Sequence, residues 1–230
     1  MNKYYEGNEK LLVSVDCIVL GFERNKLKLL IGKRKVEPGA GEWSLYGGFV
    51  RSDEDLKDAA FRVLYECTGI KDIFMQQVGA FGLVHRDPGD RVISIAYCAL
   101  INAHEYDDSL LEKYGLQWVY IDQIPPLFGD HKSMIDKALT LLREQLPVKP
   151  ISIPLLPDLF TLSQLQHVHE AVLGEEIDKR NFRKKLKQLD YIEKTPYIDK
   201  VTSKRGAALY RFNVKVYKKI AKTKDKPFVL

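Results

Sequence analysis

The chain has 230 residues, of which 45% are hydrophobic and 29% are charged, and its formal net charge is +5. This composition is ordinary for a globular protein, and no apolar run reaches the ~18 residues that a membrane-spanning helix needs. The polar N-terminus lacks the apolar core of a secretion signal, and the three cysteines are too widely spaced for a disulfide framework or a cysteine zinc site. We therefore expect a cytoplasmic protein that is not attached to a membrane.

The charge is distributed unevenly along the chain. Residues 1–150 carry 19 Lys and Arg against 22 Asp and Glu, whereas residues 151–230 carry 17 against 9. The basic C-terminal part favours a polyanionic partner, although a lysine-rich solvated surface has the same composition. Four prolines between residues 147 and 157 exclude a long helix or a central strand. We therefore place a domain boundary between residues 150 and 151.

In the first 150 residues, strands and helices are interspersed. Runs of aliphatic and β-branched residues predict strands over residues 11–21, 27–34, 73–84, 91–102 and 118–121. Apolar residues at three- and four-residue spacing predict a helix over 54–68, and a second amphipathic helix is expected over 131–146. This order of elements predicts an α+β sandwich.

The last 80 residues have a different pattern. Thr161 and Gln164 match a capping box, so a helix should begin there and end at Gly174. Asp178 is suited to cap a second helix over 178–190. Two extended segments, 191–200 and 207–216, come next and are joined by a basic turn. Two helices followed by a basic hairpin predict a winged helix-turn-helix domain.

The stretch from Gly48 resembles the Nudix box, whose pattern is G-x5-E-x7-R-E-U-x-E-E-x-G-U with U aliphatic. The matching positions are Gly48, Glu54, Arg62, Leu64, Glu66, Gly69 and Ile70. The segment before it, Trp43-Ser-Leu-Tyr-Gly-Gly, is similar to the W-x-L-P-G-G of that family. The resemblance implies a Nudix α/β/α sandwich for residues 1–150.

Two positions depart from the box. Val63 and Cys67 stand where Nudix hydrolases carry glutamates, which together with the match at Glu66 gather a divalent metal and help to activate water. Valine offers no ligand atom, and a thiol is a poor ligand for magnesium. We therefore expect no metal, no cofactor and no catalytic residue. Glu66 is then either an ion-pair partner of Arg62 or part of a binding site.

The helix predicted over 178–190 has two distinct faces. Its apolar face carries Phe182, Leu186 and Leu189. The opposite face carries a stripe of cations at helical spacing, Arg180, Arg183, Lys184 and Lys187. Solvated helices also carry such stripes, but the second helix of a helix-turn-helix is the one that enters the major groove of DNA.

Three further residues are expected to contact DNA. Asn181 is suited to adenine edges, as Arg180 is to guanine. Lys204 and Arg205 lie at the tip of the predicted wing, within reach of phosphates or the minor groove. No stretch interleaves aromatic residues for single-strand stacking, which favours duplex DNA as the partner.

The whole chain resembles Nudix-related transcriptional regulators, through the degenerate box and through the stretches 85–101, 128–139 and 160–195. The resemblance implies a homodimer that binds a palindromic operator, and a metabolite in the Nudix cleft that controls DNA binding. Among the branches of this family, the one that regulates sugar catabolism and responds to arabinose is favoured. An ADP-ribose-like nucleotide is the second choice.

The two effectors need different side chains. A neutral pentose needs carboxylates and a stacking aromatic ring, and the candidates are Trp43, Tyr46, Glu66 and Asp130. A diphosphate needs cations, and the candidates are Arg51, Arg62, Arg86 and Arg91. Structural ion pairs with the neighbouring Asp53, Asp87 and Asp90 are the favoured interpretation of these arginines. The expected function is repression of transcription. The alternatives are a Nudix hydrolase of nucleoside diphosphate derivatives with an accessory nucleic-acid-binding domain, and a scaffold that binds another protein.

Overall fold

The computed structural model describes residues 5–71, 73–103, 112, 114–201 and 205–223. A mixed sheet in the order β3-β2-β1-β6-β5 forms the centre of the N-terminal part, with β4 paired to β1 and β7 paired to β2. The strands are β1 (Leu12–Glu23), β2 (Lys26–Lys33), β3 (Trp43–Ser44), β4 (Tyr46–Phe49), β5 (Met75–Phe81), β6 (Val92–Leu100) and β7 (Leu116–Tyr120). Because β1 pairs with β2, β4 and β6, it is the axis of the sheet.

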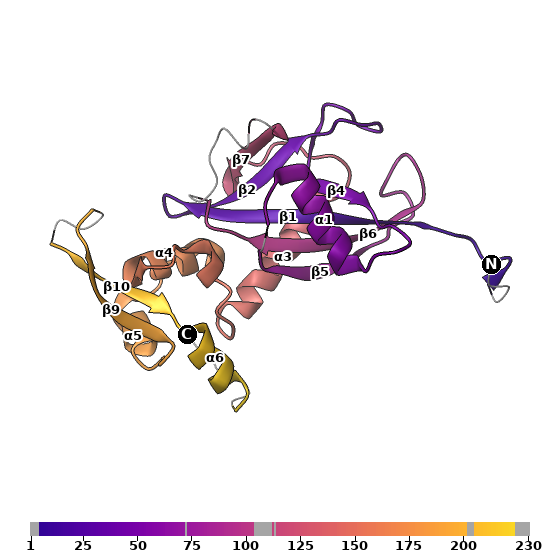
Figure 1. The fold of residues 1–230 in the computed structure, drawn as a ribbon. Coiled ribbons are helices and arrows are strands. Elements are labelled where there is room, and N and C mark those ends of the chain that lie inside the picture. The colour runs from indigo at the N-terminus through magenta and orange to yellow at the C-terminus, as the bar shows by residue number, and fades with distance from the viewer. Residues whose placement is uncertain (1–4, 72, 104–111, 113, 202–204, 224–230) are drawn as a thin grey trace.

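Two helices cover opposite faces of this sheet, α1 (Leu56–Thr68) and α3 (His131–Gln145) (Figure 1). The side chains of β1 alternate between the two faces, as the geometry of a strand requires. Cys17 and Val19 belong to the core under α1, whereas Ile18 and Leu20 belong to the core under α3. The predicted Nudix α/β/α sandwich is confirmed.

The C-terminal part is a winged helix. Its elements are β8 (Phe160–Thr161), α4 (Leu162–Leu173), α5 (Lys179–Leu186), β9 (Ile192–Asp199) and β10 (Ala207–Phe212). The small sheet has the order β8-β10-β9. Thr161 and Gln164 form the predicted capping box, Gly174 ends α4 in the left-handed region at φ 80°, and the Asp178 carboxylate accepts from the Asn181 N–H.

The ends of two elements in the C-terminal part differ most from the prediction. Helix α5 ends at Leu186, so Lys187 is its C-cap and the next residues form a turn before β9. The second predicted extended segment ends at Phe212, and helix α6 (Val214–Ala221) comes after it. The Asn213 side chain accepts from the Val216 N–H at 3.1 Å. This local cap favours a helix over continuation of the strand.

The sandwich and the winged helix share one hydrophobic core. Met134 and Leu142 of α3 belong to the same buried cluster as Leu165 of α4, Phe182 of α5 and Tyr191. The proline-rich segment contributes to this cluster through Ile151, Leu155 and Leu156. The segment is therefore packed between the two parts. No helix in the described ranges is long and apolar enough to cross a membrane.

Candidate effector site and DNA interface

Helix α1 carries the degenerate Nudix box and packs against the sheet through Val63. This side chain is 2% exposed. A Cβ atom on Gly48 would lie 2.7 Å from Val63 Cγ2, so the helix approaches β4 closely here because residue 48 has no side chain. The position of a metal-binding glutamate in the hydrolases is thus part of the apolar core.

The two glutamates that remain in the box are bound by one arginine. Arg62 donates from Nε to Glu54 Oε2 at 2.8 Å and from Nη1 to Glu66 Oε2 at 3.1 Å. The hydrogen bonds from Arg62 lower the pKa of Glu54 to about 2. Arg51 also lies 3.4 Å from Glu66. The predicted i, i+4 ion pair between Arg62 and Glu66 is present.

These side chains do not fit a catalytic divalent cation. Burial, followed by the nearby Glu66 carboxylate, raises the pKa of the Cys67 thiol, which keeps it protonated and a poor ligand. Within the described residues, no group of three or more His, Cys, Asp and Glu side chains is placed to hold a metal ion. The box therefore offers two charge-compensated carboxylates where a hard cation needs several free oxygen ligands.

A cavity of about 270 Å³ lies beside the box. It is bounded by the end of β2 and the residues after it, by β3 and β4, by the last turn of α1 and by Tyr114. Of the predicted effector residues, Tyr46 and Glu66 line it. The hydroxyl of Tyr46 is buried and has no hydrogen-bond partner among the described residues. A buried hydroxyl without a partner is costly, which favours a ligand atom beside it.

The cavity is also lined by consecutive cations that the sequence analysis did not select, Lys33, Arg34 and Lys35. The Arg34 guanidinium is partly committed, since its Nε donates to the Pro38 carbonyl at 2.8 Å and its carbon lies 3.9 Å from the centre of the Phe128 ring. Lys33 lies over the Trp43 ring at 4.1 Å. The three consecutive cations after Gly32 were the feature of the sequence from which this part of the cavity could have been predicted.

The other predicted effector residues lie outside this cavity. Trp43 packs against the core under α3 and receives Lys33 on its ring. Arg62 faces Glu54 and Glu66. Asp130 accepts two hydrogen bonds from Arg86, at 2.9 and 2.8 Å. Asp130 is thus committed to a bidentate pair, and as a direct effector ligand it would first have to leave Arg86.

Arg86 does not pair with the aspartates next to it in the sequence, as the ion-pair interpretation expected, but with Asp130 and Asp16. Its side chain is 5% exposed and also lies 3.8 Å from Asp16 Oδ2. Asp16 in turn faces His131 Nε2 at 3.6 Å and accepts a hydrogen bond from Ser94. The pairs join residues far apart in the chain, and they hold the loop after β5 onto the start of α3.

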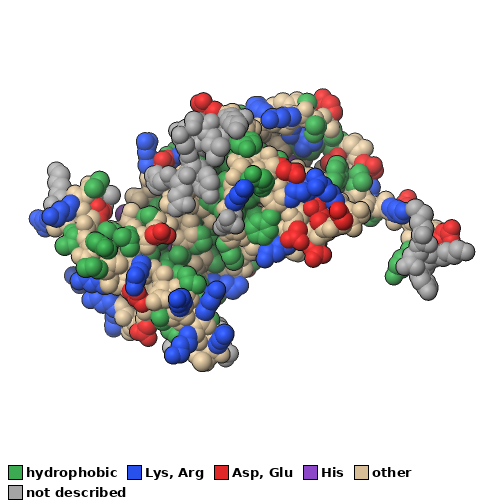
Figure 2. Space-filling model, viewed as in Figure 1, with side chains coloured by type: hydrophobic (Ala, Val, Ile, Leu, Met, Phe, Trp, Pro, Cys, Tyr) green, Lys and Arg blue, Asp and Glu red, His purple; other side chains and the backbone are tan. Residues whose placement is uncertain are grey.

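The face of α5 that the sequence predicted for DNA is mostly open to solvent. Arg180, Asn181, Lys184 and Lys187 are exposed, whereas Phe182 and Leu186 are buried. Arg183 differs from the other cations of the stripe because it is half-buried and donates from Nη2 to Ser163 Oγ at 3.4 Å. Figure 2 shows Lys and Arg side chains gathered on the winged-helix part.

At the predicted wing, Arg205 is exposed in the turn that precedes β10. Lys204 lies outside the described residues. The asymmetry of charge along the sequence is therefore a spatial asymmetry too, since the basic side chains of α5, of the wing and of α6 belong to one part of the molecule (Figure 2). Such a surface suits a polyanion.

Models of two protein families match this chain. The NUDIX domain matches residues 10–138, and the NrtR DNA-binding winged helix domain matches residues 152–212. The chain is 32% identical, over 90% of its length and 84% of the relative's, to the ADPR responsive transcriptional repressor NtrR of Acinetobacter baylyi. The chain belongs to the NrtR family of Nudix-type transcriptional regulators.

Solved NrtR structures agree with this membership. NrtR of Shewanella oneidensis in complex with a 27mer DNA superposes with a TM-score of 0.79 and 28% identity, covering 89% of this chain and 94% of that one. The NUDIX domain of the same Shewanella protein is known in complex with ADP ribose, with a TM-score of 0.50, 25% identity, and coverage of 60% of this chain and 92% of that domain. The ADP-ribose pyrophosphatase of Methanocaldococcus jannaschii is 31% identical over 54% of this chain and 70% of its own length.

Membership of the NrtR family corrects one expectation. The sugar-catabolism branch with an arabinose-like effector is not supported, because the similar NrtR proteins are described with ADP-ribose. The second choice made from the sequence, an ADP-ribose-like nucleotide, fits them.

Proposed function

We propose that this protein is a transcriptional repressor that binds operator DNA through α5 and is controlled by an ADP-ribose-type nucleotide in the cavity beside the degenerate box. The proposal is supported above all by the similarity to NrtR regulators over both domains. A DNA-binding regulator of this kind acts in the cytoplasm, where its operator lies.

The cavity chemistry supports a nucleotide over a pentose. Lys33 and Lys35 border a space that also contains the unpaired Tyr46 hydroxyl, and a diphosphate is attracted by clustered cations whereas a neutral sugar is not. The bulk of the nucleotide exceeds about 270 Å³, so this cavity would hold one end of it.

Calorimetry with ADP-ribose and with arabinose tests the effector. We expect saturable heat with ADP-ribose and none with arabinose. Lys35→Ala should weaken ADP-ribose binding several-fold, whereas Lys71→Ala, which removes an equal charge whose Nζ lies over the Tyr65 ring, should not. Heat with arabinose alone would reverse the assignment.

Hydrolysis is the second candidate function, favoured by the similarity to an ADP-ribose pyrophosphatase. Two observations argue against hydrolysis: Arg62 already binds the carboxylates of Glu54 and Glu66, and Val63 is buried where a hydrolase has a metal-binding glutamate. An assay of ADP-ribose with Mg²⁺ and with Mn²⁺ decides between them. We expect no turnover above background, and a rate on the order of 1 per second, ordinary for an enzyme, would establish a hydrolase.

We further propose that the repressor is a homodimer on a palindromic operator. A single α5 reaches few base pairs, and two copies spaced by one helical turn of DNA read a longer site. Light scattering of the free protein should give twice the mass of one chain. A species with the mass of a single chain at micromolar concentration would rule out a stable dimer.

A further inference from the structure

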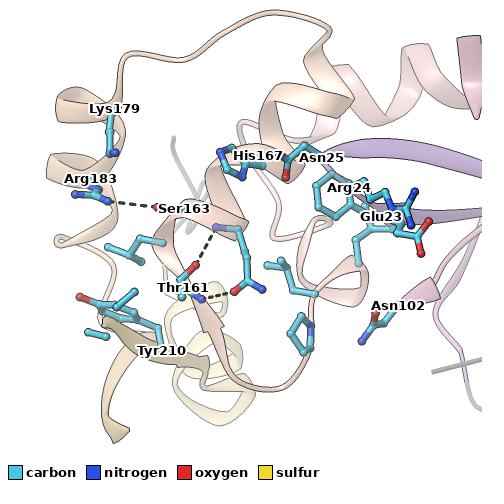
Figure 3. A pocket seen from close by; sticks show the side chains of 18 of the residues that line it. Glu23, Arg24, Asn25, Asn102, Thr161, Ser163, His167, Lys179, Arg183 and Tyr210 are labelled. Carbon is cyan, nitrogen blue, oxygen red and sulfur yellow. Dashed lines mark hydrogen bonds between the residues drawn. The ribbon is translucent and has the colours of Figure 1, made fainter. Parts of the chain in front are cut away.

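A large groove separates the winged helix from one edge of the sandwich. Its volume is about 880 Å³, and it is lined by both parts of the chain (Figure 3). The winged helix supplies the N-terminal half of α4, one side of α5 and the beginning of β10. The sandwich supplies Phe22 to Asn25, which include the turn between β1 and β2, together with Asn102.

The groove is rich in positive charge that the structure does not neutralise. The side chains of Lys179 in α5, of its C-cap Lys187 and of Arg24 in the sandwich have no hydrogen-bond or ion-pair partner among the described residues. Arg183 reaches Ser163 with one nitrogen, but its buried Nε has no partner there either. The one carboxylate in the lining, Glu23, is already paired with Lys28.

Arg24 is placed at this groove at a conformational cost. The strands pair up to Glu23 and Lys26, so Arg24 and Asn25 form a two-residue turn. Both have positive φ, 49° and 60°. A long side chain rarely adopts this conformation, and Asn is favoured at the first position of such a turn. A strained residue that also presents an unpaired charge is a candidate for function.

The position of the groove matches the course of a DNA strand. In a helix-turn-helix the second helix lies in the major groove while the first helix crosses the sugar-phosphate backbone. The N-terminal half of α4 lines the groove, with Ser163 in the middle, Lys179 and Arg183 on one side and Arg24 on the other (Figure 3). A backbone that crosses α4 would therefore meet cations from both parts of the chain.

We propose that the Arg24–Asn25 turn of the Nudix domain contacts the phosphate backbone of the operator, so that the effector domain is itself part of the DNA-binding surface. This inference rests on the proposed repressor function and adds a contact to it. It assigns the groove to a phosphodiester strand, with Arg24 neutralising one phosphate opposite Lys179 and Arg183.

The test compares Arg24→Asn with Lys26→Ala. Asn suits the turn, so the first variant should melt no lower than the wild type. Lys26 lies two residues further on and pairs with Asp122 at 2.8 Å, outside the groove lining, so the second variant removes an equal charge from the same hairpin. Binding to a random-sequence duplex of about three helical turns is measured by fluorescence anisotropy at several salt concentrations.

We expect Arg24→Asn to bind this duplex on the order of fivefold more weakly and to reduce the slope of log affinity against log salt by about 1. Arg24→Lys should retain most of the affinity, and Lys26→Ala should behave as the wild type. Equal binding by Arg24→Asn and Lys26→Ala would overturn the inference. So would pyrophosphate binding that depends on Arg24 while DNA affinity does not, since the groove would then hold a small anion.

If the proposed repressor function itself is wrong, the binding experiments give a different result. If the wild type itself binds no duplex, including sites selected from a random pool, the repressor assignment fails. If the wild type binds a selected site with salt-dependent affinity and Arg24→Asn binds it equally well, only the role of the turn is rejected.

Discussion

Arg62 occupies a position from which one guanidinium reaches both remaining glutamates of the box. Its hydrogen bonds to Glu54 and Glu66 replace the charge balance that a metal ion gives in a hydrolase. The pKa of Glu54, about 2 against a usual 4.5, reports this interaction. Since the folded pKa lies below the unfolded one, the pair stabilises the protein fully above about pH 4.5 and progressively less as the pH falls toward 2.

Arg62→Gln should remove this pH dependence. We expect the urea midpoint of the variant to lie below that of the wild type at pH 7, and the gap to narrow as the pH falls from about 5 to 3. Arg51→Gln is the control. Its side chain pairs with Glu66, and its charge lowers the pKa of Glu54 less than Arg62 does, so its gap to the wild type should narrow less. A gap for Arg62→Gln that is constant over this range would show that Glu54 does not depend on Arg62.

His169 is the second residue with a strong pH signature. It is buried, its Nε2 lies 3.0 Å from Ser152 Oγ, and burial lowers its pKa to about 3. His167, two residues before it in α4, is half-buried, whereas His169 is buried. The folded protein keeps His169 neutral in a range where the unfolded chain, with a pKa near 6.5, binds a proton.

Acidification should therefore destabilise the protein below about pH 6.5. The contribution of His169 is up to about 1.4 kcal/mol per pH unit down toward pH 3. His169→Gln should flatten the decline in stability between pH 6.5 and 5, while His167→Gln should leave it unchanged. Denaturation curves at a series of pH values check this, and parallel declines in both variants would contradict it.

Helix α5 is eight residues long between two caps and carries most of the residues that we propose to contact bases. Arg180→Ala should cost roughly 1–3 kcal/mol on a selected operator and much less on random DNA, if Arg180 contacts a guanine. Lys185→Ala is the matched control, because Lys185 is an exposed cation of the same helix outside the predicted stripe. Equal losses from both variants would mean that α5 contributes charge but no sequence recognition.

The helices and strands also differ in how well the sequence predicted them. Caps and periodicity located α1, α3 and α4 to within about two residues, because those signals are local. The early end of α5 and the presence of α6 depended on Lys187 and Asn213, whose caps compete with extension of the preceding element. The Arg86–Asp130 pair spans 44 residues, and no local pattern predicts such a partner.

At the scale of the whole molecule, the shared core predicts a single unfolding transition. Phe182 is 4% exposed and packs edge-to-face on His169 at 5.2 Å, so Phe182→Ala should cost about 3–5 kcal/mol. Both tryptophans, Trp43 and Trp118, lie in the sandwich. If the parts unfold together, Phe182→Ala lowers the midpoint seen by tryptophan fluorescence as much as that seen by circular dichroism; an unchanged fluorescence midpoint would reveal two independent units.

Strand β2 connects the two sites within this common core. Gly32 and Lys33 at its end line the cavity that we propose for the effector. The turn before β2 lines the groove between the two parts, and α4 packs against the strand. A strand of eight residues spans about 26 Å and is stiff along its length. We therefore propose that a change at the cavity reaches the winged helix through this packed strand rather than through a flexible linker.

The proline-rich segment that joins the two parts also limits how this regulator can be rebuilt. In protein engineering, a ligand-binding domain is often joined through a linker to a different DNA-binding or catalytic domain. Here a fusion made at residue 151 would remove α4 and the segment around Leu155 from the buried cluster that they share with Met134 and Leu142 of α3. A chimera joined at this segment therefore has to supply new apolar contacts in place of those of α4, Phe182 and Tyr191.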